Sequence, residues 1–371
     1  MRVVQVSVRD FRCYEQATTA LGDGLTVITG ANGAGKTNLL EALYFGATGR
    51  SFRTANEREL VRFGATAARV VLATSDEDGE HQIAVGFAPG QPKRMRVDGA
   101  DVERLVDAPQ RPLVSVFSPD RLELIKGGPS LRRAHLDQFV AAMWPARVAT
   151  RRAYAQALAQ RNALIARIRS RVASPDSLHG WDRQLAAHGV QLMTDRRTAT
   201  ELVTERFHAW CADLGLTGAP GGGPSLAYRP RSRASDAAEL AAELAERIDG
   251  DVERGFTGHG PHRDELTITR EGRELRAYGS QGQQRLALLS LLLAERDALA
   301  AHRQAPPLML LDDVMSELDR DRREALVGLL RGRPGQAVVT ATDTDQVPGS
   351  NGAGVAHLAV ADGRVLERSA A

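Results

Sequence analysis

The sequence is poor in the residue types on which several classes of protein depend. Of its 371 residues only Cys13 and Cys211 are cysteines, and they lie far apart in the chain. We therefore expect neither a disulfide scaffold nor a zinc module, and favour a reducing, cytoplasmic environment. The longest nearly apolar run is Leu286–Ala294, whereas a membrane-spanning helix needs about 20 residues. Charged residues among the first ten positions leave no secretory apolar segment.

Lysine and aromatic residues are also scarce. The 48 basic residues include only three lysines, Lys36, Lys93 and Lys126. GC-rich codon usage explains such an arginine bias, and the net charge of +2 identifies no partner. Because arginine is used almost everywhere, each lysine is a candidate position where arginine would not serve. Aromatic residues make up 5% of the chain, which argues against base stacking as the main mode of nucleic-acid binding.

What is present is typical of a globular chain, with 43% hydrophobic and 25% charged residues, and the length predicts two to three domains. Strand and helix patterns alternate up to about residue 118. From Leu131 to about Leu216 the pattern is helical, and a break at Ser174-Pro175 predicts an antiparallel hairpin of helices of about 25 residues each. Strand patterns then return. The expected strands are Leu25–Thr29, Arg69–Ala73, Gln82–Phe87, Arg94–Val97, Glu265–Thr269, Pro307–Leu311, Gln336–Ala341 and Val355–Val360, with a helix over Asn38–Ala47, an amphipathic helix over Ser235–Ile248 and a flexible linker over Gly218–Ser225.

A phosphate-binding loop is the strongest motif. It matches G-x-x-x-x-G-K-[ST] between the expected strand Leu25–Thr29 and the helix that follows. Its glycines let successive backbone N–H groups point at one anion, and the helix N-terminus adds positive potential. The lysine would reach the β- and γ-phosphates of ATP, and the threonine hydroxyl would bind Mg²⁺. The candidate cofactor-binding residues are Gly30, Ala31, Asn32, Gly33, Ala34, Gly35, Lys36 and Thr37.

A second motif is an apolar strand that ends in two carboxylates. After Pro307–Leu311 come Asp312 and Asp313, the pattern of a Walker-B strand. Asp312, together with Thr37, would hold Mg²⁺, and Asp313 would be the catalytic residue that orients or deprotonates the attacking water. Lys36 and Asp312 are 276 residues apart, much further than in small GTPases, so a large insertion separates the two motifs.

A third motif precedes this strand. Ser280, Gly282 and Gln283 open a strongly apolar helix, where a serine hydroxyl, a glycine N–H and the helix N-terminus would form a second anion site. With the later Ser316-Glu317-Leu318-Asp319, this segment resembles the signature and D-loop of an ABC-type ATPase. The resemblance implies that two chains bind head to tail, each giving its signature to the partner's ATP, so that ATP drives dimerisation and hydrolysis releases it. A simple helix cap at Ser280 is compatible with this interpretation.

The chain further resembles the RecF family of bacterial recombination and repair proteins. The residues that carry the resemblance are Phe11-Arg12-Cys13-Tyr14, Asn38–Leu43, Gly49–Arg53, Phe117–Asp120, Arg132-Arg133, Leu136-Asp137, Gly260–Asp264, Ser280–Arg285 and Leu310–Asp319. It implies an ATP-dependent protein that binds gapped or junction DNA, acts in repair, replication and the SOS response, and helps to load the RecA recombinase with partners such as RecR. No membrane partner is implied.

The expected fold is α/β: an ABC-type P-loop ATPase head, with a mixed sheet and flanking helices, that carries an inserted α-helical lobe. Residues 1–125 would form the N-terminal part of the head, 126–250 the helical lobe, and 251–371 the C-terminal part. Two departures from the wider ABC pattern suggest slow hydrolysis. Asp313 stands where glutamate is common, and Thr342-Asp343 follows the strand after which a switch histidine is usual.

Arginines are concentrated in the helical region. Between Leu131 and Arg171 there is one acid, Asp137, against nine arginines, at positions 132, 133, 147, 151, 152, 161, 167, 169 and 171. Such a cluster can neutralise DNA phosphates and make affinity depend on salt without specifying sequence; a solvated helix face explains it equally well. His262 and Arg263 could contact DNA or nucleotide, or satisfy a buried turn.

Three alternatives remain open at this stage. An SMC-type head would carry far longer coiled coils than the expected hairpin. The ATPase subunit of a transporter would be expected to carry the switch histidine and to lack a basic helical insertion. A nucleotide-gated DNA-binding module with negligible turnover is not separated from an enzyme by the sequence.

Overall fold

The computed structural model of the chain describes residues 1–105, 108, 110–218, 223–304 and 306–367. The chain forms two compact units. The first comprises Met1–Leu122, Asp213–Gly215 and Leu299–Ala371, and the second Glu123–Ala212 and Leu216–Ala298. The first unit is therefore built from both ends of the sequence.

One six-stranded antiparallel sheet of the first unit has the strand order β2-β1-β4-β5-β6-β7. Its inner face is lined by alternate apolar residues such as Val6 and Val8 of β1 and Val70 and Leu72 of β4, all buried, as the two-residue period of a strand requires. The strands are β1 (Arg2–Phe11), β2 (Tyr14–Ala20), β4 (Ala68–Asp76), β5 (Gly79–Phe87), β6 (Arg94–Val97) and β7 (Ala100–Asp101).

The other six-stranded sheet has the order β15-β14-β3-β13-β12-β8 and is parallel except for β15. Strands β3, β12 and β13 are buried along their whole length, which explains their mainly apolar sequences. Because β13 lies between β3 and β12, the segments that follow these three strands meet at one edge. The strands are β3 (Leu25–Thr29), β8 (Val114–Phe117), β12 (Leu308–Leu311), β13 (Ala337–Ala341), β14 (Val355–Ala361) and β15 (Arg364–Glu367).

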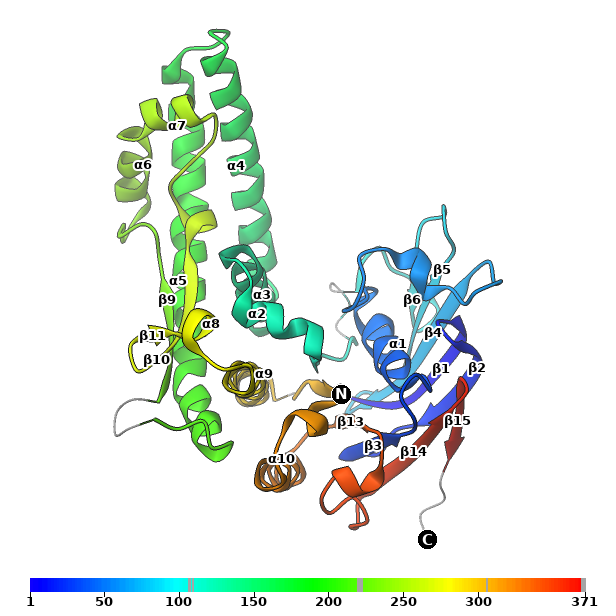
Figure 1. Cartoon of the computed structure of the whole chain (residues 1–371). Helices are drawn as coiled ribbons and strands as arrows, with labels where there is room; N and C mark the ends of the chain where they lie inside the picture. Colours follow the sequence, from blue (N-terminus) through cyan, green and yellow to red (C-terminus); the bar gives the residue numbers. More distant parts are fainter. Residues whose placement is uncertain (106–107, 109, 219–222, 305, 368–371) are drawn as a thin grey trace. The chain divides into compact units, whose positions relative to one another are not determined.

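Helix α1 (Lys36–Thr48) shares one hydrophobic core with both sheets. Its Leu40 and Leu43 are buried together with Val6 of the antiparallel sheet and with Ile28 and Leu310 of the parallel one. Figure 1 shows α1 beside these strands. The helix ends at Gly49, whose left-handed backbone (φ 69°) closes the last turn on the Phe45 carbonyl. Helix α10 (Arg320–Gly332) also belongs to this unit.

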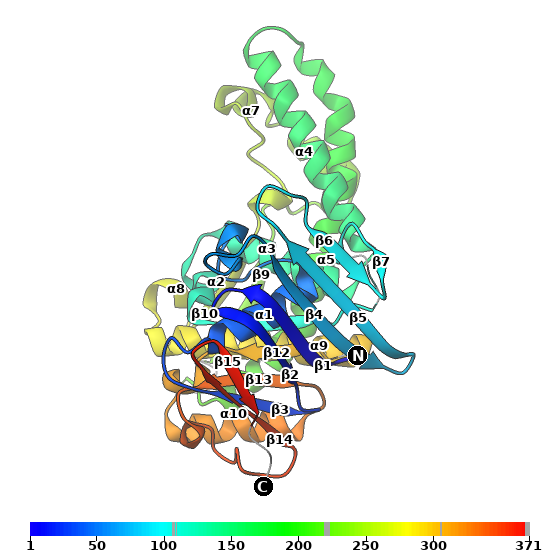
Figure 2. The same cartoon turned by 90° about the vertical axis from the view of Figure 1, so that its right-hand side faces the viewer.

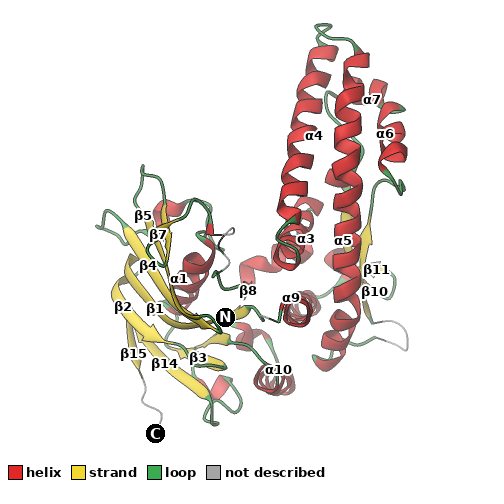
Figure 3. Cartoon of the chain, turned by 180° about the vertical axis from the view of Figure 1, so that it is seen from behind, coloured by secondary structure: helices red, strands yellow, loops and turns green. Residues whose placement is uncertain are grey.

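The second unit contains the expected helical hairpin. Helices α4 (Arg147–Arg169) and α5 (His179–Asp213) lie side by side (Figure 3). Tyr154 of α4 and Leu185 of α5 are buried in the same hydrophobic core. Ser174 caps the intervening turn by accepting from the Asp176 N–H. The expected length of about 25 residues holds for α4, whereas α5 has 35 residues. The other helices are α2 (Glu123–Lys126), α3 (Pro129–Met143), α6 (Ala237–Ala245), α7 (Ile248–Arg254), α8 (Leu275–Tyr278) and α9 (Gln281–Arg303).

A three-stranded sheet, β11-β10-β9, completes this unit. It consists of β9 (Pro224–Arg229), β10 (Glu265–Arg270) and β11 (Arg273–Glu274). The expected linker Gly218–Ser225 is wrong at its end, because Pro224 and Ser225 pair with β10; its residues 219–222 lie outside the described residues. The expected domain boundary at residue 251 also differs from the boundary between the compact units. Strand β10 pairs with β9, and residues up to Ala298 belong to the same unit as the helical hairpin.

No helix in the described ranges combines the length and the apolar character needed to cross a membrane.

Candidate functional site

The Gly30–Thr37 loop connects β3 to α1, as the motif requires. Gly30, Gly33 and Gly35 all have left-handed backbone, with φ of 156°, 82° and 117°. A Cβ on Gly30 would lie 2.2 Å from the carbonyl oxygen of Val360, and one on Gly35 would lie 2.8 Å from Sγ of Cys13. These two positions therefore exclude any other residue, whereas a Cβ on Gly33 would meet nothing within 4 Å.

Lys36 folds back over this loop. Its Nζ donates to the carbonyl oxygens of Gly30 (2.7 Å) and Ala31 (3.0 Å). Burial lowers the pKa of Lys36, and the nearby carboxylates of Asp313 and Asp312 act in the opposite direction. The ammonium group of Lys36 is thus held by backbone carbonyls of the loop. When a nucleotide binds, a phosphate oxygen would replace one of these carbonyls as the acceptor of its hydrogen bond.

The phosphate-binding loop and the Walker-B strand meet at Thr37 and Asp312, two residues that are 275 positions apart in the chain. The Thr37 hydroxyl donates to Oδ1 of Asp312 over 2.9 Å, and the Thr340 hydroxyl of β13 donates to the same oxygen over 2.9 Å. Asp312 is 6% exposed, and this burial raises the pKa of its carboxyl group, although the two hydroxyls act against that shift.

These residues fit a magnesium ion. Mg²⁺ prefers oxygen ligands, usually one or two from the protein, and completes its shell with water and phosphate oxygens. Thr37 and Asp312 offer a hydroxyl and a carboxylate oxygen in contact with each other. Within the described ranges no group of three or more His, Cys, Asp or Glu side chains could hold a metal on its own.

Asp313 is held by its backbone. It has a left-handed conformation (φ 49°), its N–H donates to the Thr340 hydroxyl (2.8 Å), and its carbonyl accepts from the Ser316 hydroxyl (2.9 Å). Thr340 therefore bonds both acidic residues at once. Sequence reasoning missed Thr340, whose only signal is a hydroxyl in an otherwise apolar strand beside the Walker-B strand.

A switch histidine is usual after this strand in ABC ATPases. Here Asp343 follows β13 and caps a short 3₁₀-helix (Thr344–Gln346) by accepting from the Asp345 N–H. This gives Asp343 a structural role at the turn.

Sequence reasoning also missed a buried carboxylate next to the loop. Glu41 of α1 is fully buried and accepts two hydrogen bonds of 2.8 Å from Arg12, one of 2.5 Å from Ser51 and one of 3.4 Å from Arg53. Arg53 also donates to Asn38 over 2.9 Å. Three sequence blocks that carry the family resemblance are thus joined around one side chain, which fixes two arginines beside the start of α1.

The signature residues belong to the second compact unit. Ser280 precedes α9 and forms a capping box: its N–H donates to Oε1 of Gln283 (2.9 Å), and its hydroxyl accepts from the Gln283 N–H (3.3 Å). Ser280 and Gly282 are exposed, and a Cβ on Gly282 would meet nothing within 4 Å. The expected helix start is present, with its hydroxyl and glycine N–H open to solvent.

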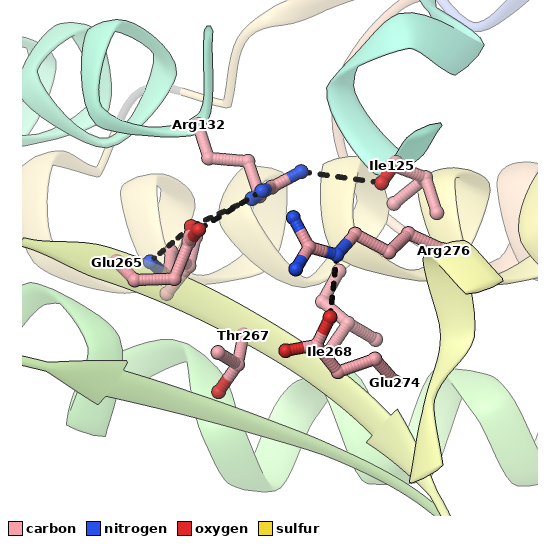
Figure 4. Close-up of a pocket in the computed structure, with 8 residues that line it drawn as sticks. Ile125, Arg132, Glu265, Thr267, Ile268, Glu274 and Arg276 are labelled. Carbon is pink, nitrogen blue, oxygen red and sulfur yellow. Dashed lines mark hydrogen bonds and ion pairs between the residues drawn. The ribbon is translucent and has the colours of Figure 1, made fainter. Parts of the chain in front are cut away.

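Two of the nine arginines expected to contact DNA are structural. Arg132 is 4% exposed, pairs with Glu265 (2.8 Å) and donates to the Ile125 carbonyl (3.2 Å). Figure 4 shows it in a hollow of about 20 Å³, room for about one water. Arg161 is fully buried between Asp182 (2.6 Å) and Asp251 (2.7 Å). Buried charges need such partners, so these two members of the cluster are not available to DNA phosphates.

The other arginines of this region are accessible. Arg133 is half-buried and donates to the Asp264 carbonyl. The exposed arginines of α4 and the following turn are Arg147, Arg151, Arg152, Arg167, Arg169 and Arg171.

Within the segment Gly260–Asp264, His262 and Asp264 form the polar contacts of a buried turn, whereas Arg263 is exposed and lies over the Phe256 ring, 5.0 Å from its centroid. Asp264 is fully buried and accepts from the Arg196 side chain, the Tyr228 hydroxyl and the Arg231 N–H. His262 donates from Nε2 to the Thr257 carbonyl and accepts at Nδ1 from Tyr154. Burial lowers the pKa of His262 to about 4, so the ring is neutral and structural.

The chain is similar to known proteins over nearly its whole length. Residues 2–358 match the family model of the RecF/RecN/SMC N terminal domain. The DNA replication and repair protein RecF of Anaeromyxobacter sp. (strain Fw109-5) is 39% identical over 98% of this chain and 99% of its own length. The corresponding protein of Myxococcus xanthus (strain DK1622) is 39% identical over 100% and 98%.

Solved structures give the same result. A recombination mediator protein RecF with ATP, from the RecFOR pathway, has a TM-score of 0.86 at 28% identity and covers 99% of this chain and 98% of that chain. The Smc head domain of Pyrococcus furiosus is alike in fold alone, with a TM-score of 0.59 at 18% identity over 99% and 96%. The fold is that of an ABC-type ATPase head with a helical lobe, and the chain belongs to the RecF family of DNA replication and repair proteins.

Proposed function

We propose that this chain is an ATP-dependent DNA-binding protein of recombinational repair and replication in the cytoplasm. The observation that carries the proposal is the hydrogen bond between Thr37 and Asp312, because it joins the phosphate-binding loop to the Walker-B carboxylate in the arrangement that ATP and Mg²⁺ need. Gly30–Thr37 would bind the phosphates, with Lys36 at the β- and γ-phosphates. Thr37 and Asp312 would hold the metal, which stabilises charge on the phosphates.

Dimerisation follows from the signature. Ser280, Gly282 and Gln283 lie at a helix N-terminus, where anions are attracted, and the first two are exposed. We propose that this helix N-terminus binds the γ-phosphate held by a second copy of the chain. ATP would then link two chains, and its hydrolysis would release them. By resemblance to the family, the dimer would act at gapped or junction DNA with a RecR-type mediator and assist loading of RecA.

Turnover is expected to be slow. Asp313 is the proposed catalytic residue, and its carboxylate is one methylene shorter than the glutamate common in ABC ATPases. The turn after β13 offers Thr342 and Asp343 in place of a histidine. ATPase assays of Asp313→Asn, with and without DNA, separate a slow enzyme from a nucleotide-gated binding module, because only the enzyme loses measurable turnover.

Sedimentation tests the central proposal. With ATP and Mg²⁺ the chain should form dimers, and Lys36→Met or Ser280→Arg should leave monomers. Binding to gapped, duplex and single-stranded DNA, with and without ATP at several salt concentrations, then tests the ligand. A nucleotide-bound chain that stays monomeric at all concentrations contradicts the proposal.

A further inference from the structure

The outer face of the antiparallel sheet carries a row of arginines. Arg9 of β1 lies directly opposite Arg69 of β4, Arg69 lies opposite Gly86 of β5, and Gly86 lies opposite Arg94 of β6. The three arginines are exposed and point away from the buried core, because they alternate with inward residues such as Val8 and Val70. Figure 2 shows β1, β4 and β5 side by side with this sheet toward the viewer.

Within the described residues, the only ion pair of this row is a long one at Arg9. The nearest acid to Arg9 is Asp10 at 3.9 Å, and Asp10 is itself paired with Arg62 at 2.8 Å. For Arg69 and Arg94, the described part of the chain supplies no ion pair. Like charges directly opposite each other on a sheet are destabilising. An external anion would therefore relieve a repulsion that the fold itself leaves in place.

The neighbouring row on the same face has short side chains on β2, β1, β4 and β5 and ends at Arg96 of β6, which is paired with Asp101 (2.7 Å). Ser7 lies opposite Thr18 on one side and Val71 on the other, and Val71 lies opposite Ala84. Side chains this short let an extended partner approach close to the strands, with the arginines standing along one side.

A fully exposed aromatic side chain adjoins this row. Phe63 is 99% exposed and lies in a tight turn in which the Ala65 N–H donates to the Arg62 carbonyl (2.9 Å) and Gly64 takes φ 85°. The Arg62 N–H donates to the Asp10 carbonyl (2.8 Å). The turn backbone is thus fixed to β1 at the residue next to Arg9, which places an exposed apolar ring near one end of the row.

We propose that Arg9, Arg69, Arg94 and Phe63 form a second DNA-contacting surface, on the ATPase head, separate from the arginines of the helical lobe. The arginines bind backbone phosphates, and Phe63 stacks on an unpaired base. The proposal rests on the proposed function only in taking DNA as the ligand. An acidic protein would use the arginine row but has no need of an exposed ring, which is why DNA with an unpaired base, as at a gap, fits the surface better.

The test compares two double variants with equal loss of charge. Arg69→Gln/Arg94→Gln removes two members of the row, and the matched control Arg2→Gln/Arg364→Gln removes two exposed arginines elsewhere in the same unit. With ATP present, the slope of log affinity for gapped DNA against log salt should fall in magnitude by about 1.4 to 1.8 in the first variant, because each phosphate contact contributes about 0.7 to 0.9. The control should keep the slope of the unaltered chain. The first variant should also melt at or above the temperature of the unaltered chain.

Phe63→Ser tests the stacking separately. Affinity for gapped DNA should fall roughly 5- to 100-fold, and affinity for a covalently closed duplex without unpaired bases should change less than twofold. Equal slopes in the two double variants, or equal gapped-DNA affinity of Phe63→Ser and the unaltered chain, overturn the inference while leaving the proposed function intact. Absence of DNA binding by the unaltered chain overturns both. If Arg69→Gln/Arg94→Gln loses binding to an acidic peptide but keeps its DNA binding, the surface is a protein-binding surface and the inference is overturned.

Discussion

At the scale of single residues, the geometry of the phosphate-binding loop explains why a chain rich in arginine has lysine at position 36. Forty-five arginines serve its ion pairs and surface, yet the phosphate-binding loop contains lysine. Nζ of Lys36 fits within 2.7 to 3.0 Å of two carbonyl oxygens of the loop. A planar guanidinium is wider than an ammonium and cannot make this approach without displacing the loop.

Lys36→Arg is therefore expected to weaken ATP binding although it keeps the charge. Loss of charge-assisted hydrogen bonds to the phosphates corresponds to roughly 10- to 100-fold in affinity, measurable by calorimetric titration with ATP and Mg²⁺. Lys126→Arg, at an exposed lysine, is the matched control and should bind as the unaltered chain does. Equal affinities of the two variants would show that charge alone is what the loop requires.

His262 predicts how stability responds to acid. Its pKa in the folded chain is about 4, against about 6.5 when unfolded, so the unfolded chain binds more protons below pH 6.5. Stability is full above pH 6.5 and is lost as the pH falls toward 4, by up to about 3 kcal/mol from this residue. Urea denaturation between pH 4 and 7 should show this slope, and His262→Gln should flatten it. His208→Gln, at an exposed histidine, should leave the slope unchanged.

At the scale of elements, local pattern predicted those parts that have a strong period of their own. The buried strand Leu25–Thr29, the glycine loop and the helix after it were predicted because each signal lies within a few residues. β9 was not predicted, because Pro224 and Ser225 follow a glycine-rich stretch and become a strand only by pairing with β10. In the same way the local sequence does not reveal the roles of Thr340 and Glu41, because these roles depend on which strands and loops the fold brings beside them.

The helical hairpin gives a prediction that separates structural from accessible arginines. Arg161→Met leaves the buried carboxylate of Asp182 without its cation and leaves the buried Asp251 paired with Arg254 alone. It should lower the free energy of unfolding by about 3 to 5 kcal/mol, as measured by urea denaturation. Arg151→Met, on the exposed surface of the same helix, should change that free energy by less than about 0.5 kcal/mol. It should instead weaken DNA binding and its salt dependence.

At the scale of the whole molecule, one helix belongs to both compact units. Residues Gln281–Ala298 of α9 lie in the second unit and Leu299–Arg303 in the first. The phosphate-binding loop is in the first unit, and Ser280, which caps α9, is in the second. A nucleotide bound between the loop of one chain and Ser280 of another would therefore constrain both units of each chain through a continuous element.

This arrangement predicts that two inactive variants complement each other. Lys36→Met lacks a working loop and Ser280→Arg lacks a working signature, so a dimer of either variant alone contains two defective sites. A mixed dimer contains one site built from two intact halves, the loop of the Ser280→Arg chain and the signature of the Lys36→Met chain. Sedimentation of the equimolar mixture with ATP and Mg²⁺ should show dimers that neither variant forms alone, with about half a nucleotide bound per chain. If each chain used its own signature at its own loop, mixing would restore nothing, because each variant would already contain its single defective site.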